Sequence, residues 1–293
     1  MNRKTRYPRF DRRQRMEHML VIISFTLLAV TGLPQKYAST GWAITTIQMF
    51  GGIEMIRQIH RLAAIILMLE TIYHGAVVTY KIVVLRLPLT MLLAWQDVQD
   101  AFQTLTHNIG IAKSPPKMGR YTFGEKAEYW AVIWGTVIMV ITGFMLWNPI
   151  ATAQFLPGQF IPAAKAAHGG EALLAVLAII TWHLYNVHIK HFNRSMFTGN
   201  ISRHEMEEEH PRELAQIEAG QVPLAPDPAA LQRRHRVFIP IAAVISIVLV
   251  AGLYFFVTFE QTAITTVPRQ ERDVFVPAAA TATPSSETTP LPD

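Results

Sequence analysis

The sequence contains no cysteine in 293 residues, and only 16% of its residues are charged. Without cysteine the chain has no disulfide framework, no thiolate zinc site, no cysteine-held iron–sulfur cluster and no covalent c-type haem attachment. Soluble domains contain about 25% charged residues, whereas 51% of this chain is hydrophobic. The composition therefore favours a membrane protein over a soluble enzyme.

Five apolar stretches approach the length of about 20 residues that a helix needs to cross a bilayer. They cover residues 17–33, 59–84, 128–147, 167–189 and 237–259. The first follows a basic segment, as the apolar part of a signal peptide does. However, no small-x-small cleavage motif follows it, and it begins with Glu17 and His18. We interpret all five as retained spans of an all-α, polytopic membrane protein.

The basic residues indicate how the spans are oriented. The N-terminus and the second and fourth connections contain 20 Lys and Arg, whereas the first and third connections and the tail contain 5. Because basic segments resist translocation, the N-terminus is expected in the cytoplasm and the C-terminus outside the cell membrane. The net charge of +5 is thus explained by topology, and we expect no nucleic-acid partner.

The spans divide the chain into five parts. These are a basic cytoplasmic N-terminus (1–16), a four-helix bundle (17–192) with a cytoplasmic interfacial loop (85–127), a cytoplasmic helix and linker (193–236), a fifth transmembrane helix (237–259) and an extracytoplasmic Thr/Pro-rich tail (260–293). In the interfacial loop, apolar residues recur at helical spacing with Asp97 and Asp100 on the other face, which predicts a helix along the membrane surface. Ser202 and Glu205 form a capping-box pattern that predicts a soluble helix ending near Gly220.

The bundle contains an internal repeat. RMEHMLVIISFTLLAVTG (15–32) aligns with KAEYWAVIWGTVIMVITG (126–143) at an offset of 111 residues. The alignment matches Glu17 with Glu128 and Thr31-Gly32 with Thr142-Gly143. A two-helix hairpin used twice predicts a four-helix bundle, to which the last span is added.

We assign the functional chemistry to the histidines in the spans. A polar side chain in hydrocarbon costs free energy, so a histidine there is a candidate functional residue. Six of the eleven lie in or at the ends of spans: His18, His60, His74, His168, His183 and His188. His60 and His74 are 14 residues apart, and His168 and His183 are 15 residues apart. Each separation is about four helical turns, so the two histidines of each pair lie on one side of their helix. By spacing alone, His60 faces His168 near the outer surface and His74 faces His183 near the inner surface. Facing imidazoles in a bundle form a bis-histidine haem b site.

Five ordered motifs resemble a known family. RMEHMLVIISFTLLAVTG, IHRLAA, MGRYTFGEKAEYW, AHGGEALLAVLAII and HLYNVHIKHFNRSMFTG are similar to the di-haem b-type cytochrome (gamma) subunit of formate dehydrogenases and to the related nickel–iron hydrogenase cytochromes. The resemblance covers about residues 12–203. It implies an outer haem on His60 and His168, as the spacing does, and an inner haem on His18 and His183.

The second ligand of the inner haem is thus open between two histidines. The resemblance favours His18, whereas the repeat favours His74, because His18 is matched by Tyr129. A third possibility is that His74 pairs with His188, which gives three haems in place of two. Glu70, one turn before His74, is a candidate to pass a proton or to hold His74 by a hydrogen bond.

The resemblance also implies a function. Two haems across a bilayer carry electrons between an extracytoplasmic redox subunit, either an iron–sulfur protein or a multihaem cytochrome c, and the quinone pool. The family binds quinone before the third helix, which implies contacts from Thr122, Gly124 and Glu125, although the family has Asn at the first and Gln at the third of these positions. The fifth helix and the tail are expected to dock the outer subunit, and the chain has no other catalytic centre.

Two other classes of function compete with this reading. A polytopic transporter would use its histidines for metal ions or protons, and would show ligands at i, i+4 or clustered acids. A purely structural anchor of an outer redox complex would leave the histidines unused. We find neither transporter pattern in the sequence and favour the electron carrier.

Overall fold

The structure is a computed structural model that describes residues 6–190, 192–221 and 227–259, so the predicted tail (260–293) and residues 222–226 of the linker before the fifth span lie outside it. The elements are β1 (Arg6–Pro8), α1 (Arg12–Lys36), α2 (Gly41–Met49), α3 (Ile53–Val83), α4 (Trp95–Asn108), α5 (Phe123–Trp147), α6 (Pro149–Phe155), α7 (Phe160–Ala178), the π-helices η1 (Ile179–His183) and η2 (Tyr185–Lys190), α8 (Ser195–Thr198), β2 (Asn200–Ser202), α9 (Arg203–Glu209), α10 (Pro211–Glu218) and α11 (Pro228–Thr258).

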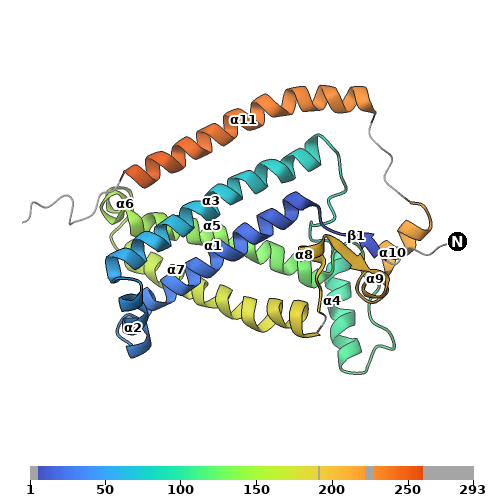
Figure 1. Ribbon diagram of the computed structural model, residues 1–293, viewed down its shortest axis with the longest axis horizontal. Helices are drawn as coiled ribbons and strands as arrows, with labels where there is room; N and C mark the ends of the chain where they lie inside the picture. The colour runs from blue at the N-terminus through green and yellow to red at the C-terminus, as the bar shows by residue number, and fades with distance from the viewer. Residues whose placement is uncertain (1–5, 191, 222–226, 260–293) are drawn as a thin grey trace, which may run out of the picture.

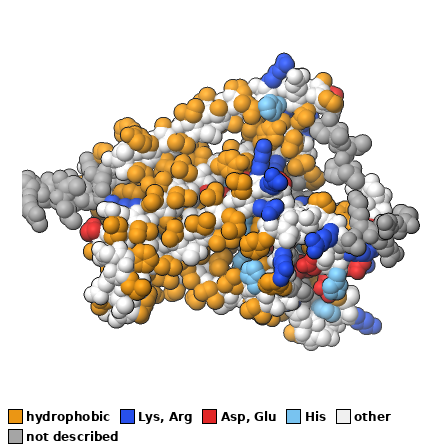
Figure 2. Space-filling model, in the orientation of Figure 1, with side chains coloured by type: hydrophobic (Ala, Val, Ile, Leu, Met, Phe, Trp, Pro, Cys, Tyr) orange, Lys and Arg blue, Asp and Glu red, His pale blue; other side chains and the backbone are white. Residues whose placement is uncertain are grey.

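All five predicted spans are helices, and the all-α, polytopic membrane class is confirmed. Within the described residues, α1, α3, α5, the continuous helix of α7, η1 and η2, and α11 are long and apolar enough to cross a membrane. At most 17% of the residues in the apolar window of any span are buried inside the protein. Apolar side chains cover most of the face of the bundle shown in Figure 2, and an outward apolar surface of this kind suits hydrocarbon and not water.

Four of the spans form the bundle, and the fifth lies against it. α1 packs on α3 and α7, and α7 packs on α5, while α11 runs along α3 (Figure 1). Near its C-terminal end, α11 inserts Phe256, whose ring stacks on Phe144 at 4.4 Å and contacts Trp147 at 5.3 Å between centroids. We call the end of the bundle where α1 begins and α3 ends the basic end, because Lys and Arg gather there (Figure 2).

A small polar cap covers part of the basic end. β1 pairs with β2 in an antiparallel ladder, and Tyr7, Ile201, Met206 and Leu214 form the cap's apolar core. The capping box of Ser202 and Glu205 is present, but the single helix expected up to Gly220 is wrong. Pro211 lacks an N–H and opens a second helix, so the segment folds as α9 and α10.

The interfacial helix predicted in the second connection is α4. Its acids are turned inward, with Asp97 8% and Asp100 5% exposed, and Asp97 binds Lys126 of α5 at 2.8 Å. Its apolar face points outward, with Trp95 and Phe102 among its most exposed side chains. An amphipathic helix with this orientation suits the surface of a bilayer.

Arg9 joins the cap to the bundle. Its guanidinium lies 3.2 Å from Glu125, near the start of α5, and 3.1 Å from Glu213 of α10, and its side chain is only 2% exposed. Arg120 adds a second contact to Glu213 at 2.7 Å and donates to the backbone carbonyl of Arg9. A buried cation with this many partners fixes the N-terminal segment against two other segments.

Substitution Arg9→Ala should therefore loosen the cap. The substitution breaks the ion pairs of Arg9 with Glu125 and Glu213, although Glu213 keeps its contact with Arg120. The loss of such hydrogen bonds between charged groups costs about 2 kcal/mol. We expect a lower unfolding temperature in detergent and faster proteolysis between β1 and α1. The matched control is Arg13→Ala, since Arg13 is exposed, and equal stability of the two variants would contradict the assigned role of Arg9.

Candidate functional site

Two pairs of histidine rings face each other inside the bundle, one at each end. The ring centroids of His60 and His168 are 6.4 Å apart, and those of His18 and His183 are 6.3 Å apart. Two imidazoles that each bond one metal at about 2 Å have ring centres about 6 Å apart, once the ring radii are added. Both separations leave room for one metal ion between the rings.

The hydrogen bonds of the first pair assign the tautomer of each ring. Thr31 Oγ1 lies 2.9 Å from Nδ1 of His60, and Thr142 Oγ1 lies 2.9 Å from Nδ1 of His168. Each hydroxyl donates its own proton to the carbonyl one turn earlier in its helix, at 2.6 Å in both cases. The hydroxyl oxygens therefore accept from Nδ1–H, and Nε2 of each ring keeps the lone pair that a metal needs.

Two glycines give these rings their space. A Cβ on Gly32 would lie 2.9 Å from Cε1 of His60, and a Cβ on Gly143 would lie 3.4 Å from Cε1 of His168. The first contact is too short for any side chain, and the second is tight. The repeated Thr-Gly motif thus orients a histidine with its threonine and makes room for it with its glycine.

The second pair differs in how its rings are held. Nδ1–H of His183 donates to a carboxylate oxygen of Glu128 at 2.7 Å, which again leaves Nε2 with its lone pair. Nδ1 of His18 is buried and has no hydrogen-bond partner among the described residues. A carboxylate–histidine contact makes the ring a more basic metal ligand.

His74, the alternative inner ligand, is engaged elsewhere. Its Nδ1 lies 2.8 Å from Glu17, and its Nε2 lies 3.1 Å from the hydroxyl of Tyr129. Two atoms that bond one iron from opposite sides stand about 4 Å apart, so the space between His74 and Tyr129 does not admit an iron. The structure brings His18, and not His74, to face His183.

The repeat explains this arrangement. Within each unit, the Glu near the start of the first helix binds the second of the two histidines on the next helix: Glu17 binds His74, and Glu128 binds His183. The next residue of the first helix instead contacts the other unit, so His18 faces His183 and its counterpart Tyr129 faces His74. The two units are therefore equivalent in their contacts, but the equivalent histidines His74 and His183 do not face each other.

A π-helix accounts for the unequal histidine spacing. His60 and His74 are 14 residues apart on a regular α-helix, whereas His168 and His183 are 15 apart. The helix changes from α7 to the π-helix η1 at Ile179, between these two histidines. A π-bulge absorbs one inserted residue. His183 therefore keeps its contact with Glu128, as His74 keeps its contact with Glu17.

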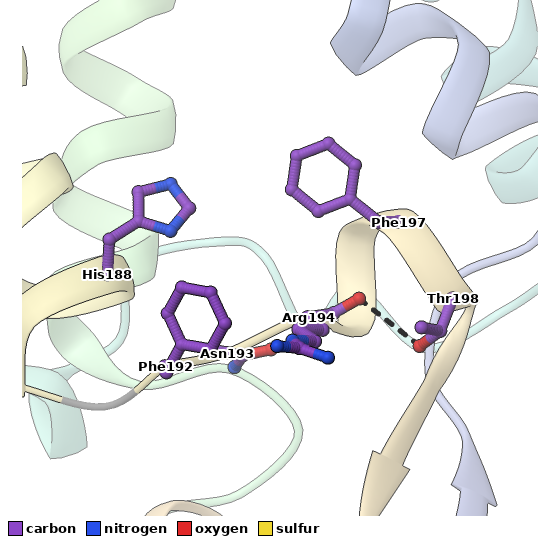
Figure 3. Close-up of a pocket in the computed structure, with 6 residues that line it drawn as sticks. All are labelled: His188, Phe192, Asn193, Arg194, Phe197 and Thr198. Carbon is purple, nitrogen blue, oxygen red and sulfur yellow. Dashed lines mark hydrogen bonds between the residues drawn. The ribbon is translucent and has the colours of Figure 1, made fainter.

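His188, the candidate for a third haem, lines an open cavity beyond the bundle. The cavity has a volume of about 320 Å³ and is shared with Phe192, Asn193, Arg194, Phe197 and Thr198 (Figure 3). The ring of His188 contacts Phe192, with centroids 6.2 Å apart. Arg194 lies over the same Phe192 ring and accepts a hydrogen bond from Thr198 through its carbonyl.

The residues expected to contact quinone lie at the start of α5. Thr122 caps the helix, and Glu125 completes the capping box and binds Arg9. A Cβ on Gly124 would contact the ring of Trp182, the neighbour of His183, at 3.7 Å. The first turn of α5 therefore lies beside Trp182, the residue before His183, while two of the three expected residues have structural partners.

The chain belongs to the family of prokaryotic cytochrome b561, which it matches over residues 9–199. Both histidine pairs lie in the matched region. The cofactor of a b-type cytochrome is haem b, and the two facing histidine pairs suit it, because hydrogen bonds at Nδ1 leave Nε2 of His60, His168 and His183 with a lone pair.

Two relatives from Escherichia coli (strain K12) are similar over most of their length. The cytochrome b556(Fdn) subunit of nitrate-inducible formate dehydrogenase is 23% identical over 206 residues, which are 70% of this chain and 88% of that protein. The cytochrome b556(fdo) subunit of formate dehydrogenase is 24% identical over 222 residues, which are 72% and 93% of the two chains. The protein is thus a multi-pass membrane cytochrome of the electron-transfer type.

The residues that orient the rings are Thr31, Thr142, Glu17 and Glu128. The sequence signal that identifies them is the repeat itself, because a motif kept in both units predicts the same contact twice.

The acids of the cap have altered ionisation. Burial, together with the nearby carboxylates of Glu125 and Glu205, raises the pKa of Glu209 to about 7. Burial beside Arg9 lowers the pKa of His210, whose Nδ1–H donates to the carbonyl of Gly119 at 2.8 Å. The first shift favours a protonated carboxyl at the basic end near neutral pH.

Glu209 should make the stability of the cap depend on pH. Because the folded chain binds this proton more tightly than the unfolded chain, the free energy of unfolding falls as the pH rises from 4.5 to about 7 and is level above. In Glu209→Gln this fall should be absent, while the opposite slope from His210 remains. Unfolding temperatures of the two proteins between about pH 5 and about pH 8 measure the difference. Glu207→Gln, at an exposed acid, is the control, and parallel curves for Glu209→Gln and the unsubstituted protein would refute the assignment.

Proposed function

We propose that the protein carries electrons across the membrane between an extracytoplasmic redox subunit and the quinone pool, through one haem b at each end of the bundle. His60 and His168 would hold the outer haem, and His18 and His183 the inner one. The observation that supports this most directly is the pair of ring separations, 6.4 and 6.3 Å, at opposite ends of the same four helices.

Haem b, when bound, supplies one-electron redox chemistry. The chain's contribution is to present two Nε2 lone pairs at each level and to fix the rings that carry them. Thr31 and Thr142 hold the outer rings by neutral hydrogen bonds, whereas Glu128 holds His183 by a charged one. Since a carboxylate makes its histidine a stronger donor and stabilises the oxidised metal, we expect the inner site to have the lower reduction potential.

The orientation and the outer partner follow from charge and from the relatives. The excess of Lys and Arg at the basic end supports a cytoplasmic position for that end, with the N-terminus inside and the C-terminus outside the cell membrane. The relatives are named as subunits of formate dehydrogenases, which supports assembly with another redox subunit. Because haems exchange single electrons, that subunit is proposed to be another one-electron carrier, either an iron–sulfur protein or a multihaem cytochrome c.

Quinone exchange is proposed at the start of α5, beside the inner haem. Gly124 and Trp182 lie next to each other there, and Trp182 precedes the ligand His183. Glu125 would be a polar contact for the quinone, and to make this contact it would have to break its ion pair with Arg9. Protons taken up at this end, with electrons arriving from the other, make the transfer electrogenic.

Replacing each histidine by alanine tests the pairing. We expect His60→Ala and His168→Ala each to lose the outer haem, and His18→Ala and His183→Ala each to lose the inner one, so that haem per chain falls by half. His74→Ala and His188→Ala should keep both haems. Pyridine haemochrome content and reduced-minus-oxidised spectra measure this.

The other outcomes of these six variants are decisive. If His74→Ala loses haem and His18→Ala does not, the inner pairing is wrong. If His74→Ala and His188→Ala each lose haem from a total of three, the third site is real. If the unsubstituted protein has no haem bands at all, the transporter or the structural anchor replaces the electron carrier.

Glycine substitutions provide a graded test of the outer site. Gly32→Ala should displace His60 and lower the outer haem content strongly, because its Cβ would lie 2.9 Å from the ring. Gly143→Ala, at 3.4 Å from His168, should have a smaller effect, and Gly75→Ala, with nothing within 4 Å, should have none. Spectra of the three variants establish the order, and an equal loss in all three would exclude steric fit as the cause.

A further inference from the structure

The inner end of the bundle contains a second cluster of ligand-type residues that no haem uses. Glu17 of α1 and Glu70 and His74 of α3 each offer one ligand atom, and these atoms lie within 4.8 Å of one another. Tyr129 of α5 closes the cluster through its hydroxyl, 3.1 Å from Nε2 of His74. The structure thus contains both features expected of a metal-binding transporter, clustered acids and ligands at i, i+4 (Glu70 and His74), which the sequence analysis does not identify.

The cluster contains two carboxyl groups and no Lys or Arg. Glu17 is 6% exposed and Glu70 is 9% exposed, on helices that cross the membrane. Among the residues that the structure describes, no Lys or Arg forms an ion pair with either carboxylate, and Oε1 of Glu17 is buried with no hydrogen-bond partner. Carboxylates at such a position require a compensating positive charge or neutralisation.

The repeat shows that this cluster is the counterpart of the inner haem site. Glu17, His74 and Tyr129 correspond to Glu128, His183 and His18. The offset of 108 that matches His60 to His168 places Ala178 opposite Glu70. This half of the bundle therefore differs from the haem half by a tyrosine in place of a histidine and by an added carboxylate.

We propose that Glu17, Glu70 and His74 bind a divalent metal ion of the zinc class. Two carboxylates and one imidazole are a mixed oxygen and nitrogen set that suits such first-row ions. Ligand atoms on one such ion lie about 3–4 Å apart, so the set closes by side-chain movements of about 1 Å. The ion supplies the charge that the two carboxylates lack and gives Oε1 of Glu17 a partner.

Binding conserves the protons of His74. The ion takes the place of the proton on Nδ1, and the ring keeps one proton by moving it to Nε2, which then donates to the oxygen of Tyr129. A metal-bound histidine commonly donates its other N–H in this way. Tyr129 is thus a positioning residue, and the ion's charge beside His18 raises the reduction potential of the inner haem.

Zinc binding to the full-length, haem-containing protein in detergent tests the proposal. After chelation and buffer exchange, Zn²⁺ is titrated and its stoichiometry and affinity are measured by calorimetry and by metal analysis. We expect a site of one ion per chain whose affinity falls at least tenfold in Glu70→Gln and in His74→Gln. Tyr129→Phe should weaken it less.

Glu171→Gln is the matched control, because Glu171 is an acid of a span at the other unit, against Gly135. It should bind zinc as the unsubstituted protein does. Haem content, recorded for every variant, verifies that the bundle is folded and keeps this test separate from the proposed electron transfer. Zinc binding that is equal in the unsubstituted protein, Glu70→Gln and His74→Gln would overturn the proposal and leave protons as the compensating charge.

Discussion

The structure depends on the cost of placing imidazoles in hydrocarbon. His60 and His168 are each held by a hydroxyl from the preceding helix, and His74 and His183 are each held by a carboxylate. These contacts link the two helices of each hairpin, and they also decide which ring nitrogen is free. The same hydrogen bonds therefore stabilise the bundle and prepare it to bind a metal.

A duplicated hairpin gives two equivalent halves, but function is not divided equally between them. At the level of His60 and His168 the two units contribute identical parts, a Thr-Gly motif and a histidine each. At the other end one half has His18 opposite His183, whereas the other has Tyr129 opposite His74. The π-helix η1 corrects the register of one unit. Small local changes thus separate a haem site from a cluster of acids.

Much of this was predictable from the sequence, for physical reasons. Long apolar runs have few alternatives to membrane helices, so the five spans were found, with ends that differ by a few residues. Helical periodicity predicts that His60 faces His168, and their ring centroids lie 6.4 Å apart. The partner of His183 could not be decided in this way, since His18 and His74 lie at the same depth and rotation about the bundle axis is set by packing. Pro211 was overlooked as a helix break, and the inward acids of α4 required the tertiary partner Lys126.

The central claim is that each end of the bundle holds one iron between two imidazoles. Electron paramagnetic resonance of the oxidised, purified protein tests it most directly. The account predicts two low-spin ferric signals of the bis-imidazole type, and the two should be distinguishable, because the ring planes are inclined by 67° in one pair and 44° in the other. A single such signal, or a high-spin or tyrosinate-ligated iron, would contradict it.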